Sequence, residues 1–142
     1  MTHKPIRWLA EDASDLEILS AAAQDSIFQV ADGVWLPAAR RFTLKIQRFV
    51  WEASDSMGNG ERVWAALSFD SVLGVQAQKI VQTRREAFAS LLSISFELGD
   101  SPAGQVTLNL ADGGVIALNV ECLDAALADL SDVREAVARP TH

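Results

Sequence analysis

The stretch FASLLSISFELGDSPAGQVTLNLADGGVIALNVECLDAAL, residues 88–127, decides the fold, because apolar and polar residues alternate in three of its runs. The runs begin at Leu92, Val106 and Ile116. A period of two is typical of strands that bury one face. Segments rich in Gly, Asp and Pro separate the runs, and these residues form turns. The stretch therefore predicts three antiparallel strands in sequence.

The second of these turns could be two or three residues long. A two-residue turn places Leu108 opposite Ala117 and sets an apolar row against small and polar residues. A three-residue loop over residues 112–114 places Leu108 opposite Leu118, so that apolar residues share one face. We predict the three-residue loop, with a glycine in the left-handed region of backbone conformation.

Helices are predicted before and after the sheet. Ser14 and Glu17 have the spacing of a capping box, which predicts a helix over residues 15–24. Beyond Val120 the alternation stops, and leucines recur at helical spacing at positions 123, 127 and 130. The sequence therefore predicts a C-terminal helix.

Three residues in or near this C-terminal segment need separate interpretation. Cys122 stands just before the predicted helix, where it is either a reactive thiol or a buried small apolar residue. Asp129 and Asp132 would lie three residues apart on the helix. Exposed acids at that spacing are typically solvated, so we predict that this pair has no catalytic role.

Short strands fill the region between the N-terminal helix and residue 88. Phe28 and Leu36 share a face if residues 31–33 form a hairpin loop, which would turn Trp35 to the opposite face. A second hairpin is predicted around residues 70–72, pairing the strands on either side of it. Trp8, in a first short strand over residues 6–10, is predicted to face the core.

The strand that begins at Phe42 loses its alternation at Arg48, which occupies a position where an apolar side chain is due. A bulge near Gln47 and Arg48 would return Phe49 and Trp51 to the core side. We therefore predict a bulge, which would also bend the strand as a rolled sheet requires.

Together these elements predict an α+β fold. Its sheet would be an antiparallel roll or barrel of about eight strands, with an N-terminal and a C-terminal helix. The order of elements resembles a pleckstrin-homology-type rolled sheet, and an ordinary antiparallel sandwich or barrel is the alternative. A chain of 142 residues is predicted to form a single domain over residues 1–142, with loose termini at 1–4 and about 138–142.

Composition restricts the partners of the chain. The net charge of −7 argues against binding to nucleic acid, which requires a positive field. No apolar run is long enough for a membrane span, and the first residues lack the apolar core of a signal peptide. One cysteine cannot form an internal disulfide, so we expect a cytoplasmic protein.

Catalytic and metal-binding residues are not recognisable in the sequence. The two histidines, His3 and His142, stand at the two ends of the chain, and cysteine is not clustered with histidine. A catalytic triad needs a fixed histidine, and a zinc site needs clustered ligands. We therefore predict no catalytic residue, no metal and no cofactor.

An aromatic and basic surface is the candidate binding site. Trp35 and Trp64 occupy the outward parity of their strands, and Arg41 and Lys45 share the outward parity of a nearby strand. Exposed tryptophan is typical of interfaces. The alternative is that another part of the chain covers both tryptophans. Such a surface would suit an unknown protein, an anionic ligand or a second subunit.

Two functions follow from these observations. The first is a non-catalytic binding or scaffold module that self-associates, with a homodimer favoured because two-fold pairs dominate oligomers. The alternative is a small metal-independent enzyme that acts on an anionic substrate through the basic strand from Arg40 to Arg48.

Four segments carry a resemblance to a known family. They are Arg7–Asp12 (RWLAED), Pro37–Phe42 (PAARRF), Arg48–Glu52 (RFVWE) and Val120–Asp124 (VECLD). Together they resemble an uncharacterised alphaproteobacterial family, domain of unknown function 2948, over nearly the whole chain. The resemblance implies a bacterial, cytoplasmic, single-domain protein and brings no activity or site residue.

Overall fold

The computed structural model describes residues 5–50, 61–78 and 87–130. These residues form β-strands and one α-helix. Ten strands form one antiparallel sheet, so the expected α+β class with antiparallel pairing is confirmed. The helix is α1 (Ala13–Ala23), and two short 3-10 turns are η1 (Val30–Asp32) and η2 (Pro37–Ala39). The strands are β1 (Arg7–Ala10), β2 (Ile27–Gln29), β3 (Gly33–Leu36), β4 (Arg41–Phe49), β5 (Arg62–Phe69), β6 (Val72–Gln78), β7 (Phe88–Leu98), β8 (Gly104–Leu110), β9 (Val115–Val120) and β10 (Ala125–Asp129).

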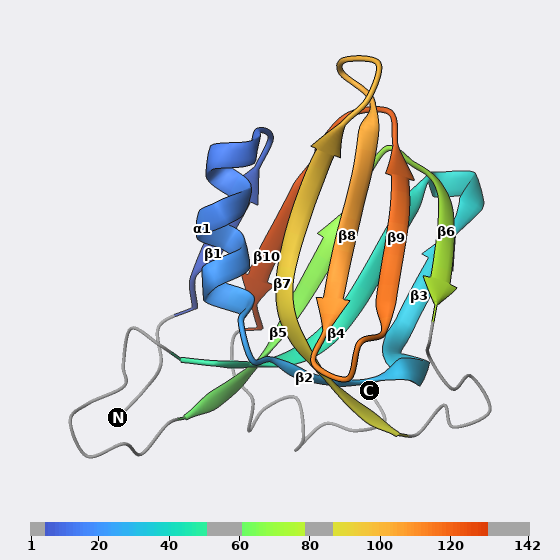
Figure 1. Cartoon of the computed structure of the whole chain (residues 1–142). Helices are drawn as coiled ribbons and strands as arrows, with labels where there is room; N and C mark the ends of the chain where they lie inside the picture. The colour runs from blue at the N-terminus through green and yellow to red at the C-terminus, as the bar shows by residue number, and fades with distance from the viewer. Residues whose placement is uncertain (1–4, 51–60, 79–86, 131–142) are drawn as a thin grey trace.

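The sheet folds over on itself into two layers (Figure 1). Its strand order is β1-β10-β5-β4-β2-β7-β8-β9-β6, with β3 paired to β4 beside this path. We call β1, β10, β5, β4 and β3 the β5 layer, and β7, β8, β9 and β6 the β8 layer. β2 pairs with both β4 and β7 and joins the layers. The sheet is not closed, and β1 and β6 are the strands at the two ends of the order.

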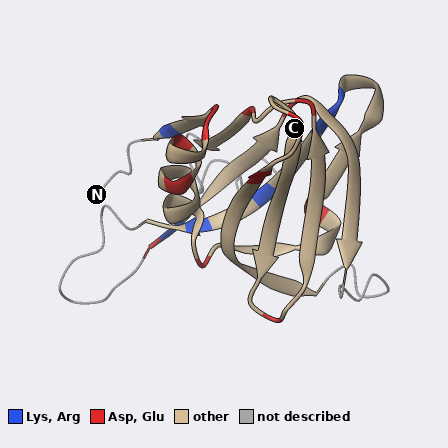
Figure 2. Ribbon diagram, turned by 45° about the horizontal axis from the view of Figure 1, so that its top comes forward, with Lys and Arg blue, Asp and Glu red and all other residues tan. Residues whose placement is uncertain are grey.

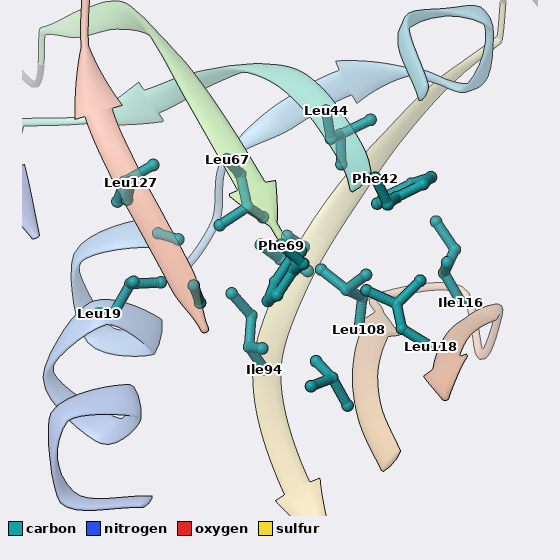
Figure 3. Packing of buried hydrophobic residues seen from close by; sticks show 14 of the residues in the cluster. Leu19, Phe42, Leu44, Leu67, Phe69, Ile94, Leu108, Ile116, Leu118 and Leu127 are labelled. Carbon is teal, nitrogen blue, oxygen red and sulfur yellow. The ribbon is translucent and has the colours of Figure 1, made fainter. Parts of the chain in front are cut away.

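The hydrophobic core lies between the two layers (Figure 3). Leu67 and Leu127 reach into it from the β5 layer, and Leu108 and Leu118 from the β8 layer. All four are fully buried. In β8 and β9 the alternation is as predicted, because every second side chain enters one shared interior. In β7 it is not: a register shift between Leu91 and Ser93 buries Leu91 and leaves Leu92 45% exposed, so the predicted inward face is wrong at Leu92.

Helix α1 covers the side of this core between β1 and β7 (Figure 1). Its residues Leu16 and Leu19 are buried in the core. The N-cap is Asp12, whose Oδ1 accepts a hydrogen bond of 2.8 Å from the backbone N–H of Asp15. The predicted helix is confirmed, but its cap is Asp12 rather than Ser14, because a carboxylate two residues earlier already satisfies the first free N–H group.

The hairpin of β8 and β9 has a three-residue loop, as predicted, but it begins one residue earlier. Leu108 pairs with Ile116 and not with Leu118. Gly113 adopts φ +94°, and Gly114 N–H donates to Asp112 Oδ1 at 2.9 Å. The predicted register is therefore wrong by two positions. The inward face is unchanged, because a shift of two residues keeps every side chain on its side.

The C-terminal helix predicted from residue 123 onward is wrong over residues 125–129, which form strand β10. Leu123, Ala125 and Leu127 are buried at alternate positions, and β10 pairs with both β1 and β5. Cys122 is partly exposed and precedes a strand, so no helix N-terminus acts on its thiol. The remainder of the predicted helix, including Asp132, lies outside the described residues.

Strands β2 and β3 do not form the predicted hairpin. Both pair with β4, at Gln47 and at residues 41–44, so they lie one after the other along the same edge of that strand. The turn η1 between them changes the phase of β3. As a result Trp35 is paired with Phe42 and packs against the core, and its predicted outward orientation is wrong.

The second predicted hairpin, around residues 70–72, is also wrong, because β5 and β6 belong to different layers. β5 pairs with β4 and β10, whereas β6 pairs with β9. Ser71 has φ +61°, and Val72 N–H donates to the carbonyl oxygen of Arg40 at 2.9 Å. This turn carries the chain from one layer to the other, so adjacency in sequence does not give pairing.

Gly104 marks a close approach between β7 and β8. A Cβ at this position would lie 2.7 Å from ring atoms of Phe96 and in contact with the backbone oxygen of Glu97. We expect Gly104→Ala to lower the free energy of unfolding by about 1–3 kcal/mol, as overpacking does. Gly74→Ala is the control, because a Cβ there meets nothing within 4 Å. Urea titration measures both, and equal losses would contradict this account.

Candidate functional site

Strand β4 places a charged residue inside the protein. Its buried side chains are Phe42, Leu44, Ile46 and then Arg48, in unbroken alternation, and Arg48 has 0% exposure. The ladder between β4 and β5 runs without a register shift. The predicted bulge near Gln47 and Arg48 is therefore wrong. The strand keeps its phase because the arginine finds a partner in the interior.

That partner is Asp129, on β10. Arg48 Nε donates to Asp129 Oδ1 at 2.6 Å, and Nη2 donates to Oδ2 at 2.8 Å, so the pair is bidentate. Nη1 of Arg48 also donates to the backbone oxygen of Phe49 at 3.1 Å. Two parallel charge-assisted hydrogen bonds offset much of the free energy that burial of each charge costs.

Strand β1 covers this ion pair. The guanidinium carbon of Arg48 lies 4.5 Å from the centroid of the Trp8 ring. The backbone N–H of Ile6 donates to Asp129 Oδ2 at 3.1 Å, and Asp129 N–H donates to the oxygen of Ile6 at 2.9 Å. Trp8 also packs against the core, as predicted. The pair therefore joins β1, β4 and β10.

Asp129 was predicted to be a solvated helical acid, and this prediction is wrong. Its side chain is fully buried in the ion pair, on a strand. Sequence reasoning missed both partners. The signal that could have found them is the alternation of buried positions along each strand. Arg48 stands at the next buried position of β4, and Asp129 stands at the next buried position after 125 and 127 in β10. Two opposite charges in buried phase indicate an internal ion pair.

The opposite side of the β5 layer, which we call the outer face, carries Trp64 and Lys45. Trp64 is partly exposed and lies between the buried residues Val63 and Ala65 of β5, so it takes the outward parity predicted for it. Lys45 Nζ lies 4.6 Å from the centroid of the Trp64 ring. A cation at this distance over tryptophan is attracted by the ring. Trp35, in contrast, packs on the inner side.

Two rows of side chains run across the outer face beside Trp64. One row pairs Leu9, Ala126, Ser68, Thr43 and Val34 across five strands. The other pairs Arg7, Ala128, Ala66 and Lys45. Neither row contains an acid, and the middle of each consists of small side chains. The outer face is therefore flat along these two rows and has no acid in them, and the carboxylate of Asp70 lies beyond them in its ion pair with Arg41.

The arginines of the basic strand do not converge on one point. Arg40 Nη1 donates to Glu121 at 2.7 Å, and Arg41 Nε donates to Asp70 at 2.7 Å. The hydrogen bond that Arg41 donates to Asp70, and then the attraction between the two charges, raise the pKa of Arg41. Arg48 is inside the protein. Each of the three arginines thus has a different carboxylate as its partner, which is not the arrangement of an anion clamp.

The described residues contain neither a metal-ligand cluster nor a helix that could span a membrane. In residues 5–50, 61–78 and 87–130, no three His, Cys, Asp or Glu side chains come together in a group that could hold a metal ion. The described helix is neither long nor apolar enough to cross a membrane. The candidate site is therefore the outer face, described by its shape and charge.

Comparisons with known proteins place the chain in one family. The family model described as "Protein of unknown function (DUF2948)" matches residues 6–142. No curated protein and no solved structure matches the chain. The match covers nearly all of the sequence and brings no activity, so a function has to be argued from the geometry.

Proposed function

The chain belongs to the DUF2948 family, whose function is unknown, and we propose from its geometry that it is a non-catalytic binding module that self-associates as a homodimer. The outer face of the β5 layer is the proposed contact surface. The single observation that carries the proposal is a partly exposed Trp64, stacked with Lys45, on the outer face of the β5 layer.

Charge supports a second copy as the occupant of the outer face. The chain has a net charge of −7, so two copies repel each other at most surfaces. The two cross-strand rows of the outer face contain Arg7 and Lys45 and no acid. Along these two rows, two such faces can therefore approach without placing carboxylates against each other.

The strands of the outer face supply part of the area of a stable contact. They have four, five, eight, nine and four residues in the order β1, β10, β5, β4 and β3, so at about 3.3 Å per residue and about 4.8 Å between strands they span roughly 480 Å². A standard interface buries about 800 Å² per partner. Lys45 lies midway along β4, and Trp64 lies at one end of this face, because β10 ends opposite Ala65. Leu9 (60% exposed) and Val34 (44% exposed) lie on its two outermost strands.

The alternative function, an enzyme that clamps an anionic substrate along Arg40 to Arg48, has less support. Arg40 and Arg41 are bound to Glu121 and Asp70, and Arg48 is bound to Asp129. An anion would have to displace these carboxylates. Lys45, stacked on Trp64, is the remaining cation of the cluster, and it belongs to the outer face.

We also propose that the rolled sheet is of the pleckstrin-homology type. Its support is that antiparallel strands form two packed layers around one core. Strand β10 stands where the beginning of the closing helix of that fold was expected. The later part of that expected helix lies outside the described residues.

Trp64→Glu tests the outer face directly. A glutamate would be desolvated within the contact, so we expect the variant to have half the mass of the wild-type oligomer or less. Light scattering at high micromolar concentration measures this mass, against 15.4 kDa for one chain. Thermal unfolding checks that the fold is intact.

The control is Thr107→Glu, which places the same charge on the outer side of strand β8 in the other layer. We expect this variant to keep the wild-type mass. Wild-type protein that stays monomeric at high micromolar concentration, or a Trp64→Glu variant of unchanged mass, would exclude the outer face as the contact.

A further inference from the structure

Strand β6 has an open edge. It stands at one end of the strand order and pairs with β9 alone. On the side away from β9, the backbone N–H of Val72 in β6 donates a hydrogen bond of 2.9 Å to the carbonyl oxygen of Arg40. From Leu73 to Gln78 that side has no backbone partner within residues 5–50, 61–78 and 87–130. Several donors and acceptors are thus available to another strand.

This edge lacks the features that usually prevent strand-to-strand association. The sequence of β6, VLGVQAQ, contains no charged residue and no proline, and Figure 2 accordingly draws the strand in tan. Other edge strands of the sheet are better protected: β1 carries Arg7, and β3 has four residues and is followed by Pro37. Natural sheets generally protect a free edge with charge, proline or short length.

Gly74 gives a second, independent indication. A Cβ at this position would meet nothing within 4 Å, and the residue does not have a positive φ. Neither packing nor backbone conformation within the chain requires glycine here. The register against β9 shifts between Val72 and Gly74, and Leu73 beside it is 55% exposed. A glycine in a strand often marks a bulge, as at this register shift, or a place where another backbone approaches closely.

We propose that β6 pairs antiparallel with β6 of a second copy of the chain, so that the β8 layers of two molecules form one continuous sheet. A two-fold axis pairs any strand antiparallel with itself, and this strand is self-complementary because it carries no charge that would face its own copy. In a chain of net charge −7, an uncharged edge is a favourable place for two copies to meet.

The register of this contact follows from the strand itself. Full overlap of the seven residues Val72–Gln78 puts Val75 on the two-fold axis and Leu73 opposite the partner's Ala77. If the register between the two β6 strands shifted by one residue, the apolar face of the partner's strand would turn to the outer side of the joined sheet. Full overlap therefore satisfies the most backbone groups and keeps Val75, which packs against the core, on the inner side.

This contact is separate from the outer face, which belongs to the other layer. Two different two-fold contacts on one chain generate a closed tetramer when their axes meet at right angles, and an open chain of molecules otherwise. The inference goes beyond the proposed function, because either contact can exist without the other.

Cross-linking tests the pairing and its register. Residues directly opposite in an antiparallel pair have Cα atoms about 4.5–5.5 Å apart, within the range of a disulfide. In a Cys122→Ser background, we expect Val75→Cys to give a covalent dimer on mild oxidation. Gln78→Cys is the matched control, because full overlap holds the two substituted positions about 20 Å apart. A non-reducing gel measures both.

A second variant tests the contact without a thiol. Leu73→Lys with Ala77→Lys places lysine opposite lysine across the axis, on exposed positions, and should halve the mass of the oligomer in light scattering. Failure of Val75→Cys to cross-link more than Gln78→Cys overturns the proposal, as does an unchanged mass of the double lysine variant.

The two proposals fail differently. If the outer face alone is wrong, Trp64→Glu keeps the wild-type mass and Val75→Cys still cross-links. If the β6 contact alone is wrong, Val75→Cys stays uncross-linked and Trp64→Glu is a monomer. The same Trp64→Glu protein carrying Val75→Cys and Cys122→Ser shows directly whether β6 pairs when the outer face is disabled.

Discussion

Asp129→Ala is expected to lower the free energy of unfolding by about 3–5 kcal/mol, the loss seen when one partner of a buried ion pair is removed. The guanidinium of Arg48 would keep its place at 0% exposure without the two hydrogen bonds from 2.6 to 2.8 Å that now compensate its charge. The N–H of Ile6 would also lose its side-chain acceptor. Urea titration followed by tryptophan fluorescence measures the loss.

A double variant separates the cost of an unpaired charge from the cost of lost packing. Arg48→Met with Asp129→Leu removes both charges and fills the space with apolar side chains, so its stability should equal or exceed that of the wild type. A double variant as unstable as Asp129→Ala would show that packing, not charge, sets the cost. A loss below about 1 kcal/mol in Asp129→Ala would exclude the ion pair as a major contributor.

Leu118→Ala is expected to cost about 2–5 kcal/mol, the range for a core leucine truncated to alanine. Leu118 is fully buried in β9, and its strand neighbours are Val106 on β8 and Val75 on β6. Truncation removes apolar contacts with both neighbouring strands and leaves a cavity between the layers. Denaturant titration gives the change in free energy.

Asn119→Ala is the control for this prediction, because Asn119 is the next residue of the same strand and is exposed on the other side. A substitution there should change the free energy of unfolding by less than about 0.5 kcal/mol. If Leu118→Ala costs under 1 kcal/mol, the inner face of β9 has been assigned wrongly.

Strands β8 and β9 could be predicted because their alternation is strict and the turn between them is local. The face of β7 was predicted only in part, because the register shift between Leu91 and Ser93 leaves Leu92 exposed. The register failed by two positions at one turn, where Ala111 was counted as strand. It belongs to the loop, since Gly113 holds the positive φ and Asp112 accepts the N–H of Gly114. Periodicity thus gives the face of a strand, whereas turn chemistry gives its partner.

The last described strand could not be predicted, because alanine fits both periods. Alanines at 125, 126 and 128 leave leucines 123 and 127 as the main markers of phase, and a spacing of four suits a helix and a strand equally. These residues form a strand because β10 pairs with β1 on one side and β5 on the other. The local sequence gives no information about these distant partners.

The candidate site was predictable in part. Trp64 could be placed outward because Val63, Ala65 and Leu67 alternate around it without interruption. Trp35 could not, because β3 has four residues and its phase depends on the turn η1 before it. Arg48 was expected to interrupt its strand, since its partner Asp129 is 81 residues away in the sequence.

The place of β10 also has a consequence for how the chain is made. Its residues complete the ion pair with Arg48 across 81 residues and the hydrogen bond with Ile6 across 123 residues. On a ribosome that adds about 5–20 residues per second, β5 emerges several seconds before the strand that will cover its edge. Pairings this distant in sequence are slow to form. During translation, therefore, the edge of β5 that β10 will cover stays unpaired until residues 125–129 have been made.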